Sequence, residues 1–327
     1  MKAMLVDKHQ TLVWSDVAEP ICNDDTIIID IESVAINRAD ILQRKGAYPS
    51  PKGWPEWMGL EVAGKVLAMG NLAKEESSFK VGDNVCALLG GGGYAERVAV
   101  PYNMVMPIPK GLTAVEAAAL PEAYATSYLN LFYEGHLKAG QTVYIAAGAS
   151  GLASVAIPMA KAFGAKVVTS VLNADIAKAI EPLGADIIVD TSREKLEDVF
   201  KALDEAGEPV NVAMDCLCGN TLGKCMQYMA EGGYWVVIST LAGTETNIFL
   251  RPLLTRGIHL VGSMLRKRSV DEKAALLDDL VKKVWPFLES GEIKPSIYKV
   301  LPISKAMEAH AILERGENIG KVVLTLK

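Results

Sequence analysis

Histidine, cysteine and aromatic residues are scarce in this sequence of 327 residues, and it contains no long hydrophobic run. The four histidines, His9, His136, His259 and His310, have no motif partners, so we expect ordinary surface or core roles for them. The five cysteines are odd in number and scattered, which favours a reducing compartment over a disulfide framework. No apolar stretch approaches the roughly 20 residues that a membrane-spanning helix needs.

The chain also lacks an excess of positive charge. Its formal net charge is −6, whereas nucleic-acid binding needs a basic face. The N-terminal stretch MKAMLVDKHQ lacks the basic and apolar segments of a secretory signal. We therefore expect a cytoplasmic protein with no nucleic-acid partner and no membrane partner. The hydrophobic share of 50% indicates a globular chain with enough core for one large or two ordinary domains.

A strand that runs through glycines into a helix is the most informative stretch. Residues 141–147 have the short apolar pattern of a buried parallel strand. Gly148 and Gly151 let the backbone turn sharply and approach a ligand, and a helix from about residue 151 aims its free N–H groups into that turn. A dinucleotide pyrophosphate is the predicted occupant. The spacing is not the strict G-x-G-x-x-G, so an ordinary strand–helix turn is the alternative.

The segments that follow alternate between strand and helix patterns. A helix is predicted at 174–184, and further buried strands are predicted at 166–172, 186–190, 210–217, 234–239 and 258–262. This rhythm is typical of a doubly wound parallel sheet. The apolar last strand, near 258–264, would leave an edge open to pairing, and this favours a homodimer.

The first 118 residues or so have a different pattern, with short strands separated by Pro- and Gly-rich connections. Thr113 is a plausible helix N-cap, and Glu116 would complete a capping box. Near the C-terminus, helices are predicted at 269–290 and 304–315, and strands around 299–301 and 321–326. The N-terminal strands are predicted at 1–6, 26–34, 61–69, 83–88 and 94–101. We therefore expect a β-rich lobe that the C-terminal segment completes.

Six ordered motifs together resemble the medium-chain dehydrogenase/reductases, and within them the zeta-crystallin-like NADPH:quinone oxidoreductases. They are NRADILQRKGAYPSP (37–51), GLEVAGKV (59–66), VGDNVCALLGGGGYAERVAVP (81–101), LPEAYATSY (120–128), the glycine turn, and NIGKVVL (318–324). The resemblance implies an α/β fold in which a GroES-like, β-rich catalytic domain spans 1–118 and 263–327. A doubly wound Rossmann domain would span 119–262, and in similar proteins two such domains pair into a dimer.

Zinc ligands are missing at the positions where the family's alcohol dehydrogenases carry them. Those enzymes hold catalytic zinc with a Cys and the His of a Gly-His-Glu motif, whereas this chain has Asn37 and Leu60 there. Only Cys86 lies where a structural zinc lobe would supply four cysteines. The remaining candidate, Cys216-x-Cys218 with Cys225, lacks a fourth ligand nearby, so buried thiols are the favoured interpretation.

The resemblance implies that Tyr48 and Asn37 line the nicotinamide cleft as the catalytic residues. A phenol offers both an apolar face and a hydrogen-bond donor, although Tyr48 could instead be a loop anchor. Arg38 and Asp40 are predicted to form a structural pair at a helix start. Trp54 and Trp57, like the glycine run 90–93, fit either a substrate cleft or a packed turn.

Cofactor contacts are expected on the same basis at the glycine turn and at the ends of later strands. No acid stands near Val171 to bind a ribose 2′-OH, as NAD enzymes commonly have, and the Lys that NADPH enzymes of this branch carry is also missing. NADPH is preferred, with NADH as the alternative, and Lys178 or Arg193 is a candidate cation. The expected contact residues are Thr126, Gly148, Ala149, Ser150, Gly151, Leu152, Ser170, Asn173, Leu217, Leu241, Ser263, Leu265 and Asn318.

These features lead to a predicted activity. Without zinc to polarise a carbonyl, the acceptor is expected to be electrophilic already. The first hypothesis is an NAD(P)H-dependent reductase that transfers hydride to a small-molecule quinone or enone. The second is an enoyl or alkenal double-bond reductase. The third, from another class, is a non-catalytic nucleotide-binding protein with a structural or sensing role, similar to some zeta-crystallins.

Overall fold

The computed structural model describes residues 1–326, which form two compact units. The β-rich unit consists of residues 1–125 and of the described residues from 266 onward, and the parallel-sheet unit is Thr126–Leu265. The sequence places these boundaries at 118/119 and 262/263 instead. Helix α4 (Pro121–Tyr128) spans the structural boundary between residues 125 and 126. Because the helix is continuous, the composition of the sequence does not change at that boundary.

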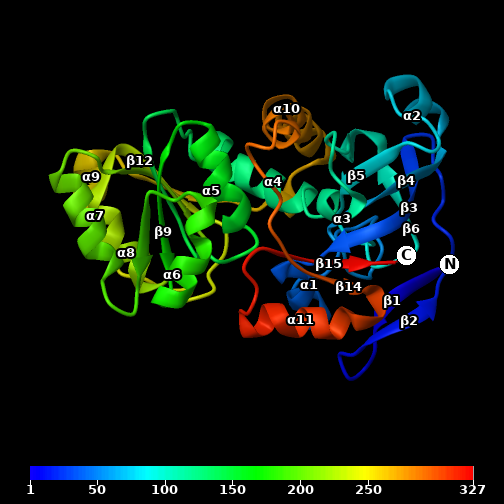
Figure 1. The fold of residues 1–327 in the computed structure, drawn as a ribbon, viewed down its shortest axis with the longest axis horizontal. Coiled ribbons are helices and arrows are strands. Elements are labelled where there is room, and N and C mark those ends of the chain that lie inside the picture. Colours follow the sequence, from blue (N-terminus) through cyan, green and yellow to red (C-terminus); the bar gives the residue numbers. More distant parts are fainter. Residues whose placement is uncertain (327) are drawn as a thin grey trace. The chain divides into compact units, whose positions relative to one another are not determined.

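The parallel-sheet unit has six strands in the order β10-β9-β8-β11-β12-β13, all parallel. Numbered from β8, this is the order 3-2-1-4-5-6 of the doubly wound nucleotide-binding fold, so the predicted fold is confirmed. Figure 1 shows α5 and α6 on one side of the sheet and α7, α8 and α9 on the other. The strands are β8 (Thr142–Ile145), β9 (Lys166–Val171), β10 (Ile187–Asp190), β11 (Val210–Asp215), β12 (Met229–Val237) and β13 (His259–Gly262). The helices are α5 (Ala153–Ala162), α6 (Ala174–Ile180), α7 (Leu196–Glu205), α8 (Asn220–Cys225) and α9 (Leu250–Arg256), with a π-helix at Leu129–Glu134.

An aromatic core holds one face of this sheet against its helices. Tyr144, Phe200 and Trp235 contact one another and are almost fully buried. The indole N–H of Trp235 donates to Asp215 Oδ2 at 3.1 Å, so this large side chain leaves no unpaired donor in the core. Asp215 Oδ1 accepts from the backbone N–H groups of Leu217 and Cys218, and this fixes the loop that follows β11.

The β-rich unit contains a seven-stranded sheet and a separate hairpin. The order β14-β15-β3-β4-β5-β7, with β6 against β3, places the last strand of the chain between β14 and β3. In Figure 1, this red strand and the blue N-terminal strands lie in the same unit. The strands are β1 (Lys2–Val6), β2 (Leu12–Asp16), β3 (Thr26–Ala35), β4 (Glu61–Met69), β5 (Asn84–Leu88), β6 (Arg97–Pro101), β7 (Val105–Pro107), β14 (Ile297–Pro302) and β15 (Lys321–Thr325).

Capping boxes begin two helices of this unit. At α3 (Ala114–Ala117) the Thr113 hydroxyl accepts from the Glu116 N–H, which confirms the predicted cap, and Ser269 does the same for Glu272 at α10 (Val270–Glu289). The other α-helices are α1 (Arg38–Arg44), α2 (Asn71–Glu76) and α11 (Ala306–Arg315). Within residues 1–326, no helix is both long and apolar enough to cross a membrane.

Candidate active site

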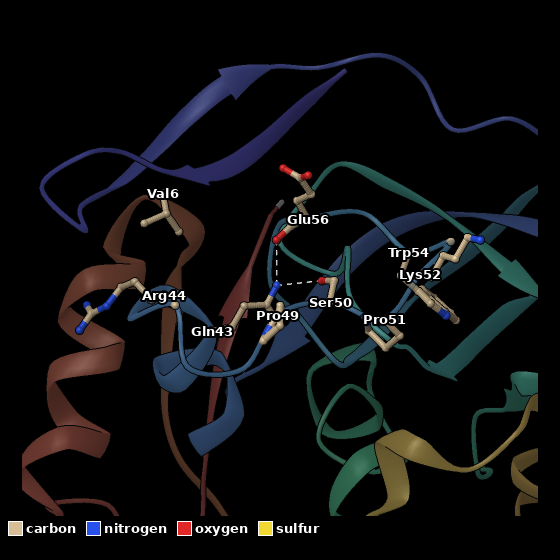
Figure 2. A pocket seen from close by; sticks show the side chains of 11 residues that line it. Val6, Gln43, Arg44, Pro49, Ser50, Pro51, Lys52, Trp54 and Glu56 are labelled. Carbon is tan, nitrogen blue, oxygen red and sulfur yellow. Dashed lines mark hydrogen bonds between the residues drawn. The ribbon is translucent and has the colours of Figure 1, made fainter.

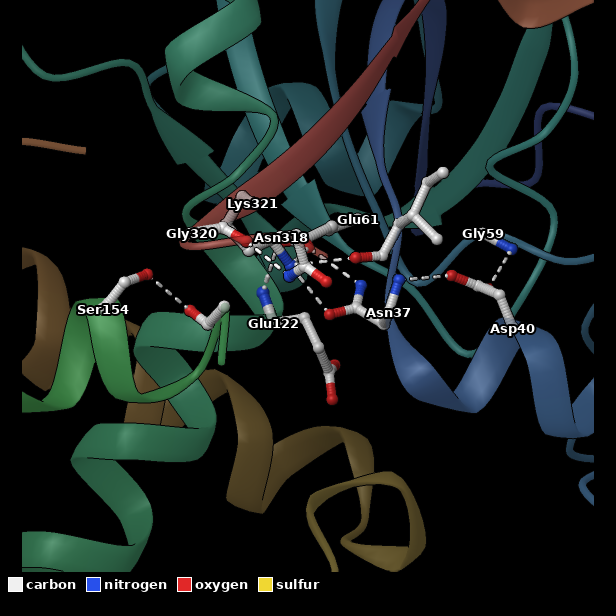
Figure 3. A network of polar contacts seen from close by, with 11 residues as sticks. Asn37, Asp40, Gly59, Glu61, Glu122, Ser154, Asn318, Gly320 and Lys321 are labelled. Atoms are coloured by element: carbon white, nitrogen blue, oxygen red, sulfur yellow. Dashed lines mark hydrogen bonds and ion pairs between the residues drawn. The ribbon is translucent and has the colours of Figure 1, made fainter. Parts of the chain in front are cut away.

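A closed polar cluster lies where β3, β4 and β15 meet in the β-rich unit (Figure 3). The Lys321 ammonium donates to Glu61 Oε1 at 2.6 Å and to Asn37 Oδ1 at 2.8 Å. The Asn37 amide in turn donates to Glu61 Oε1 at 2.8 Å. Glu61 is fully buried and Lys321 is 4% exposed. A buried ion pair needs such extra hydrogen bonds to offset its desolvation.

The start of α1 fixes Asn37. Its backbone N–H donates to Asp40 Oδ2 at 2.7 Å, and Gly59 N–H donates to Asp40 Oδ1 at 3.0 Å. Asp40 therefore pairs with backbone groups, and Arg38 donates to the Leu313 carbonyl instead, so the predicted Arg38–Asp40 pair is wrong. Burial raises the pKa of Asp40 to about 6, although both N–H donors oppose the shift.

Tyr48 lies half-buried on the loop after α1, and Arg266 holds it. The guanidinium carbon is 4.3 Å from the ring centroid, a cation–π distance, and NH1 donates to the Tyr48 carbonyl at 3.2 Å. The same guanidinium donates to the Gly90 carbonyl at 2.7 Å. Arg266 thus connects the Tyr48 loop to the glycine run 90–93.

The glycine run contacts a packed loop. A Cβ at Gly90 would lie 2.7 Å from the Trp54 ring, and the Trp57 indole donates to the Gly92 carbonyl at 3.0 Å. The sequence left open whether the glycine run lines a substrate cleft or forms a packed turn. The close contacts with the tryptophans support the packed turn. The tryptophans serve this packing.

An open hollow of about 550 Å³ lies beside the same loop (Figure 2). It is lined by Val6, Gln43, Arg44 and residues of the 46–56 loop. The Gln43 amide bridges the loop by donating to Ser50 Oγ at 2.9 Å and to the Glu56 carbonyl at 2.8 Å. Neither Tyr48 nor Asn37 lines this hollow, so we assign it no role in the chemistry.

In the parallel-sheet unit, the glycine turn joins β8 to α5 as predicted. A Cβ at Gly148 would lie 2.6 Å from Thr169 Oγ1 and 2.8 Å from Ile180 Cδ1. Glycine at 148 is therefore required for packing against neighbouring elements. Ala147 has φ of +55°, a left-handed conformation that costs a non-glycine residue roughly 1–2 kcal/mol. The Ser150 hydroxyl accepts from the first N–H of α5, that of Ala153, at 3.1 Å.

The topology gathers most of the expected cofactor residues at one edge of the sheet. The chain reverses direction across the sheet between β8 and β11, and nucleotides bind at the carboxyl ends of strands at such a switch point. Ala149, Gly151 and Leu152 follow β8 there. The loops after β11 and β12 pair with each other, because the N–H of Leu241 donates to the Cys216 carbonyl at 3.1 Å, next to Leu217.

The remaining expected contacts fall into different settings. Ser263 follows β13, with its N–H bonded to the Val237 carbonyl, and Leu265 is buried two residues later. The Ser170 hydroxyl lies inside the unit, 2.8 Å from the hydroxyl of Tyr144.

Three further expected residues have local backbone contacts. Asn173 caps α6 by accepting from the Ile176 N–H. The Thr126 carbonyl accepts from the Asn130 amide, and the Asn318 amide donates to the Gly320 carbonyl. Asn318 belongs to the β-rich unit, whereas the glycine turn belongs to the parallel-sheet unit.

The donor set of the β-rich cluster does not fit zinc. A lysine ammonium already occupies the space between Glu61 and Asn37, and a second cation there would be repelled. Burial, with the charge of Glu61, raises the pKa of the Cys86 thiol well above its usual range, which disfavours the thiolate that zinc needs. Among residues 1–326, no three or more His, Cys, Asp or Glu side chains form a group that could hold a metal ion.

Four residues of the site carry no role in the sequence-based prediction: Glu61, Glu122, Arg266 and Lys321. Glu61 and Lys321 stand inside two of the quoted motifs, but 260 positions separate them. A lysine next to the glycine of NIGKVVL and an acid at the start of a strand were the available signals. Arg266 had none, because its contacts depend on how two loops fold.

Comparisons with known proteins assign both units to families. The alcohol dehydrogenase GroES-like domain matches residues 23–110, and the zinc-binding dehydrogenase domain matches residues 151–282. The quinone oxidoreductase-like protein 2 homolog of Nematostella vectensis is 32% identical over 303 residues, which cover 91% of this chain and 81% of the relative. The 2-methylene-furan-3-one reductase of Solanum lycopersicum is 32% identical over 320 residues, which cover 95% of this chain and 74% of that protein.

A solved structure agrees with these matches. The quinone oxidoreductase of Thermus thermophilus, whose complex with NADPH has also been solved, is 27% identical and superimposes with a TM-score of 0.82 over all of both chains. The two domain matches, the identities above 30% and the shared fold lead to one assignment. The chain belongs to the medium-chain dehydrogenase/reductase family, among its quinone oxidoreductase-like members.

Proposed function

We propose that this protein is an NAD(P)H-dependent reductase that transfers hydride to quinones or related conjugated carbonyls without a metal ion. The observation that supports this most directly is the closed cluster, in which Lys321, rather than a histidine or a cysteine, meets Glu61 and Asn37. Without a Lewis acid to polarise a simple ketone, an acceptor that is already electrophilic suits the site. The names of the relatives from Nematostella and Thermus support this acceptor class.

Each unit contributes its own residues to the proposed reaction. When bound, the nicotinamide supplies the hydride. The turn at 148–152 would hold the pyrophosphate with backbone N–H groups, aided by the positive end of α5. Tyr48 would contact the nicotinamide and donate a hydrogen bond, while Arg266 keeps its ring in place. Asn37 would position Glu61 and Lys321, since its amide bonds to both.

NADPH is the proposed cofactor, with NADH as the alternative. Val171 of β9 pairs in register with Asp190 of β10, so the loops that follow these strands are neighbours. The second loop carries Arg193, whose side chain is 75% exposed and lies 3.4 Å from Asp190. A guanidinium there suits a 2′-phosphate beside Asn173. Lys178 lies in the second turn of α6, farther from the strand end.

A double-bond reductase is the second candidate, because the tomato relative is named for reducing a 2-methylene-furan-3-one. Hydride addition to a conjugated C=C needs the same cofactor and the same proton source. The deciding experiment is steady-state oxidation of NADPH and NADH with a panel of quinones and alkenals, in the presence of a strong chelator. We expect acceptor-dependent oxidation that the chelator does not change. Dinucleotide binding without turnover on any acceptor would instead indicate a sensing or structural protein.

A variant of the glycine turn links that activity to the predicted cofactor site. Gly151→Val should weaken dinucleotide affinity at least about tenfold, or ~1.4 kcal/mol, because the branched side chain intrudes where the backbone approaches the pyrophosphate. Ala179→Val, on the exposed part of α6, is the matched control and should bind normally. Equal affinity in both folded variants would place the dinucleotide elsewhere.

A further inference from the structure

Glu122 stands next to the closed cluster without being enclosed by it. It lies in the first turn of α4, and its backbone N–H donates to Glu61 Oε2 at 2.9 Å. Because Glu61 is fully buried and paired with Lys321, this bond holds the start of the helix in place. The position of Glu122 is therefore as well defined as that of the buried pair.

The side chain of Glu122 points the other way. Figure 3 shows its carboxylate directed away from Glu61 and Lys321, and the residue is only partly buried. Glu61 uses its two oxygens to close the cluster, whereas the carboxylate of Glu122 faces outward from it. The residue keeps partial exposure, which a proton donor to a reacting molecule needs.

The surroundings of Glu122 favour its neutral form. Burial raises its pKa to about 7, the charges of Glu61 and Asp40 add to the shift, and Lys321 and Lys273 oppose it. The charge of Glu122 also acts on Tyr48. Burial, followed by this charge, raises the pKa of the Tyr48 phenol. The charged and titratable groups that interact electrostatically with this carboxyl come from β4, β15, α1, α10 and the loop after α1. They are Glu61, Lys321, Asp40, Lys273 and Tyr48.

Lys273 completes the arrangement from α10. It is 6% exposed, and its ammonium donates to the Arg266 carbonyl at 3.1 Å. Burial lowers the pKa of Lys273, while the charge of Glu122 counteracts the shift. When Glu122 loses its proton, this cation stabilises the carboxylate left behind. Lys273 therefore lowers the cost of forming the Glu122 carboxylate when the proton is transferred during turnover.

We propose that Glu122 is the catalytic acid of this site, which delivers to the acceptor the proton that accompanies the hydride. The proposal rests on the proposed function and extends it by naming the proton donor. For an enone, hydride from NAD(P)H forms a bond to the β-carbon as the C=C bond breaks, and NAD(P)⁺ is released. The O–H bond of Glu122 breaks as the enolate oxygen takes the proton. For a quinone, hydride and proton together give the hydroquinone. Water then returns a proton to the Glu122 carboxylate.

The test compares the pH dependence of kcat/KM between pH 6 and 9 for the full-length protein and its variants, with an alkenal as acceptor. The parent rate should fall as pH rises through about 7, because the acid must be protonated. Glu122→Gln keeps the shape and the backbone bond but cannot donate an acidic proton. It should lose about 10²-fold at pH 6, at the lower end of the range for general acids, and its rate should not follow the same fall.

Matched variants separate this role from a structural one. Glu122→Asp should retain part of the rate and the pH-dependent fall, and Glu75→Gln, on exposed α2, should match the parent. NADPH affinity of Glu122→Gln, measured by nucleotide fluorescence, should stay unchanged. A parent-like rate and pH profile in Glu122→Gln would overturn the proposal for Glu122 alone. A parent that oxidises neither NADPH nor NADH with any acceptor would overturn the proposed function itself.

Discussion

Arg266 fixes the orientation of Tyr48 mainly through the ring face and the backbone carbonyl, and it also interacts with the tyrosine hydroxyl. The guanidinium lies over the ring and bonds to the backbone carbonyl, so the ring position depends on its face and on the loop. Removing the hydroxyl takes away one contact with Arg266 but keeps the ring stacking and the bond to the backbone carbonyl, so the ring should stay in place. The stacking role and the hydrogen-bonding role of Tyr48 can therefore be measured independently.

Tyr48→Phe should keep cofactor affinity and lose turnover. The loss should be small for quinones, which are already strongly electrophilic, and larger, up to about 10²-fold, for alkenals, whose developing enolate oxygen loses a hydrogen bond. Tyr48→Ala should also weaken cofactor binding, since the stacking face is gone. Turnover and nucleotide titration measure both effects, with Tyr298→Phe on exposed β14 as control. If Tyr48→Ala behaves as the parent with every acceptor, Tyr48 is only a loop anchor.

His310 is a residue whose protonation should control stability in acid. It is fully buried, and its Nε2 lies 3.0 Å from the hydroxyl of Tyr94. Burial, followed by the charge of Arg44, lowers the pKa of His310 to about 3. The folded state thus holds His310 neutral while the unfolded chain takes up a proton below about pH 6.5. Stability from this group is present at neutral pH and is lost as pH falls from about 6.5 towards 3.

The expected loss from His310 between pH 7 and pH 5 is about 2 kcal/mol of unfolding free energy. Urea unfolding of the parent and of His310→Gln at both values measures it. The variant should be less stable at pH 7 but should lose less on acidification than the parent does. His9→Gln, on an exposed turn, should follow the parent. A parent-like loss in His310→Gln would show that other groups cause the acid sensitivity.

At the scale of elements, the sequence predicts the parallel-sheet strands well because each is a short apolar run between turns. In the β-rich unit, the predicted strand at 61–69 coincides with β4 (Glu61–Met69). The predicted helix at 269–290 corresponds to α10 with its cap. Helices α2 and α7 are not predicted, although Leu196, Phe200 and Leu203 bury one face of α7 at helical spacing. The ion pair of Glu61 with Lys321 cannot be read from one sequence, since the two residues meet only because β4 and β15 both pair with β3.

The adjacent ends of β9 and β10 should determine the cofactor preference. Arg193→Ala should raise the KM for NADPH about tenfold, or ~1.4 kcal/mol, and leave the KM for NADH unchanged, because only NADPH carries the 2′-phosphate. Lys178→Ala, on the neighbouring helix, is the control and should leave both values unchanged. The measurement is initial-rate kinetics with each cofactor in turn. An equal effect of Arg193→Ala on both cofactors would remove the arginine from the phosphate site.

At the scale of the whole molecule, one edge of the parallel sheet is markedly apolar. Strand β13 pairs only with β12 within the described chain, and α9 leads into it. Exposed apolar side chains gather on these two elements and beside them: Phe249 (58%), Leu250 (71%), Leu254 (82%), Leu260 (47%) and Met264 (43%). An open edge with such side chains is a pairing surface, and we propose that a second copy of the chain covers it.

Leu254→Glu should therefore shift the protein from dimer to monomer, because a carboxylate in an apolar interface loses its hydration. Light scattering at micromolar concentration should give the parent twice the chain mass of 35.1 kDa and the variant a single chain mass. Ile21→Glu changes an aliphatic side chain that is 75% exposed in the β-rich unit, and it should leave the dimer intact. A monomeric parent would contradict the proposed pairing.

The place of β15 between β14 and β3 has a consequence for synthesis of the chain. The parallel-sheet unit is one continuous segment and leaves the ribosome whole, whereas the β-rich unit waits for its last strand. Glu61 emerges 260 residues before its counter-ion Lys321. Until then its carboxylate cannot be buried without several kcal/mol of penalty. Completion of the sheet and neutralisation of the Glu61 carboxylate therefore depend on the same late segment, which carries Lys321.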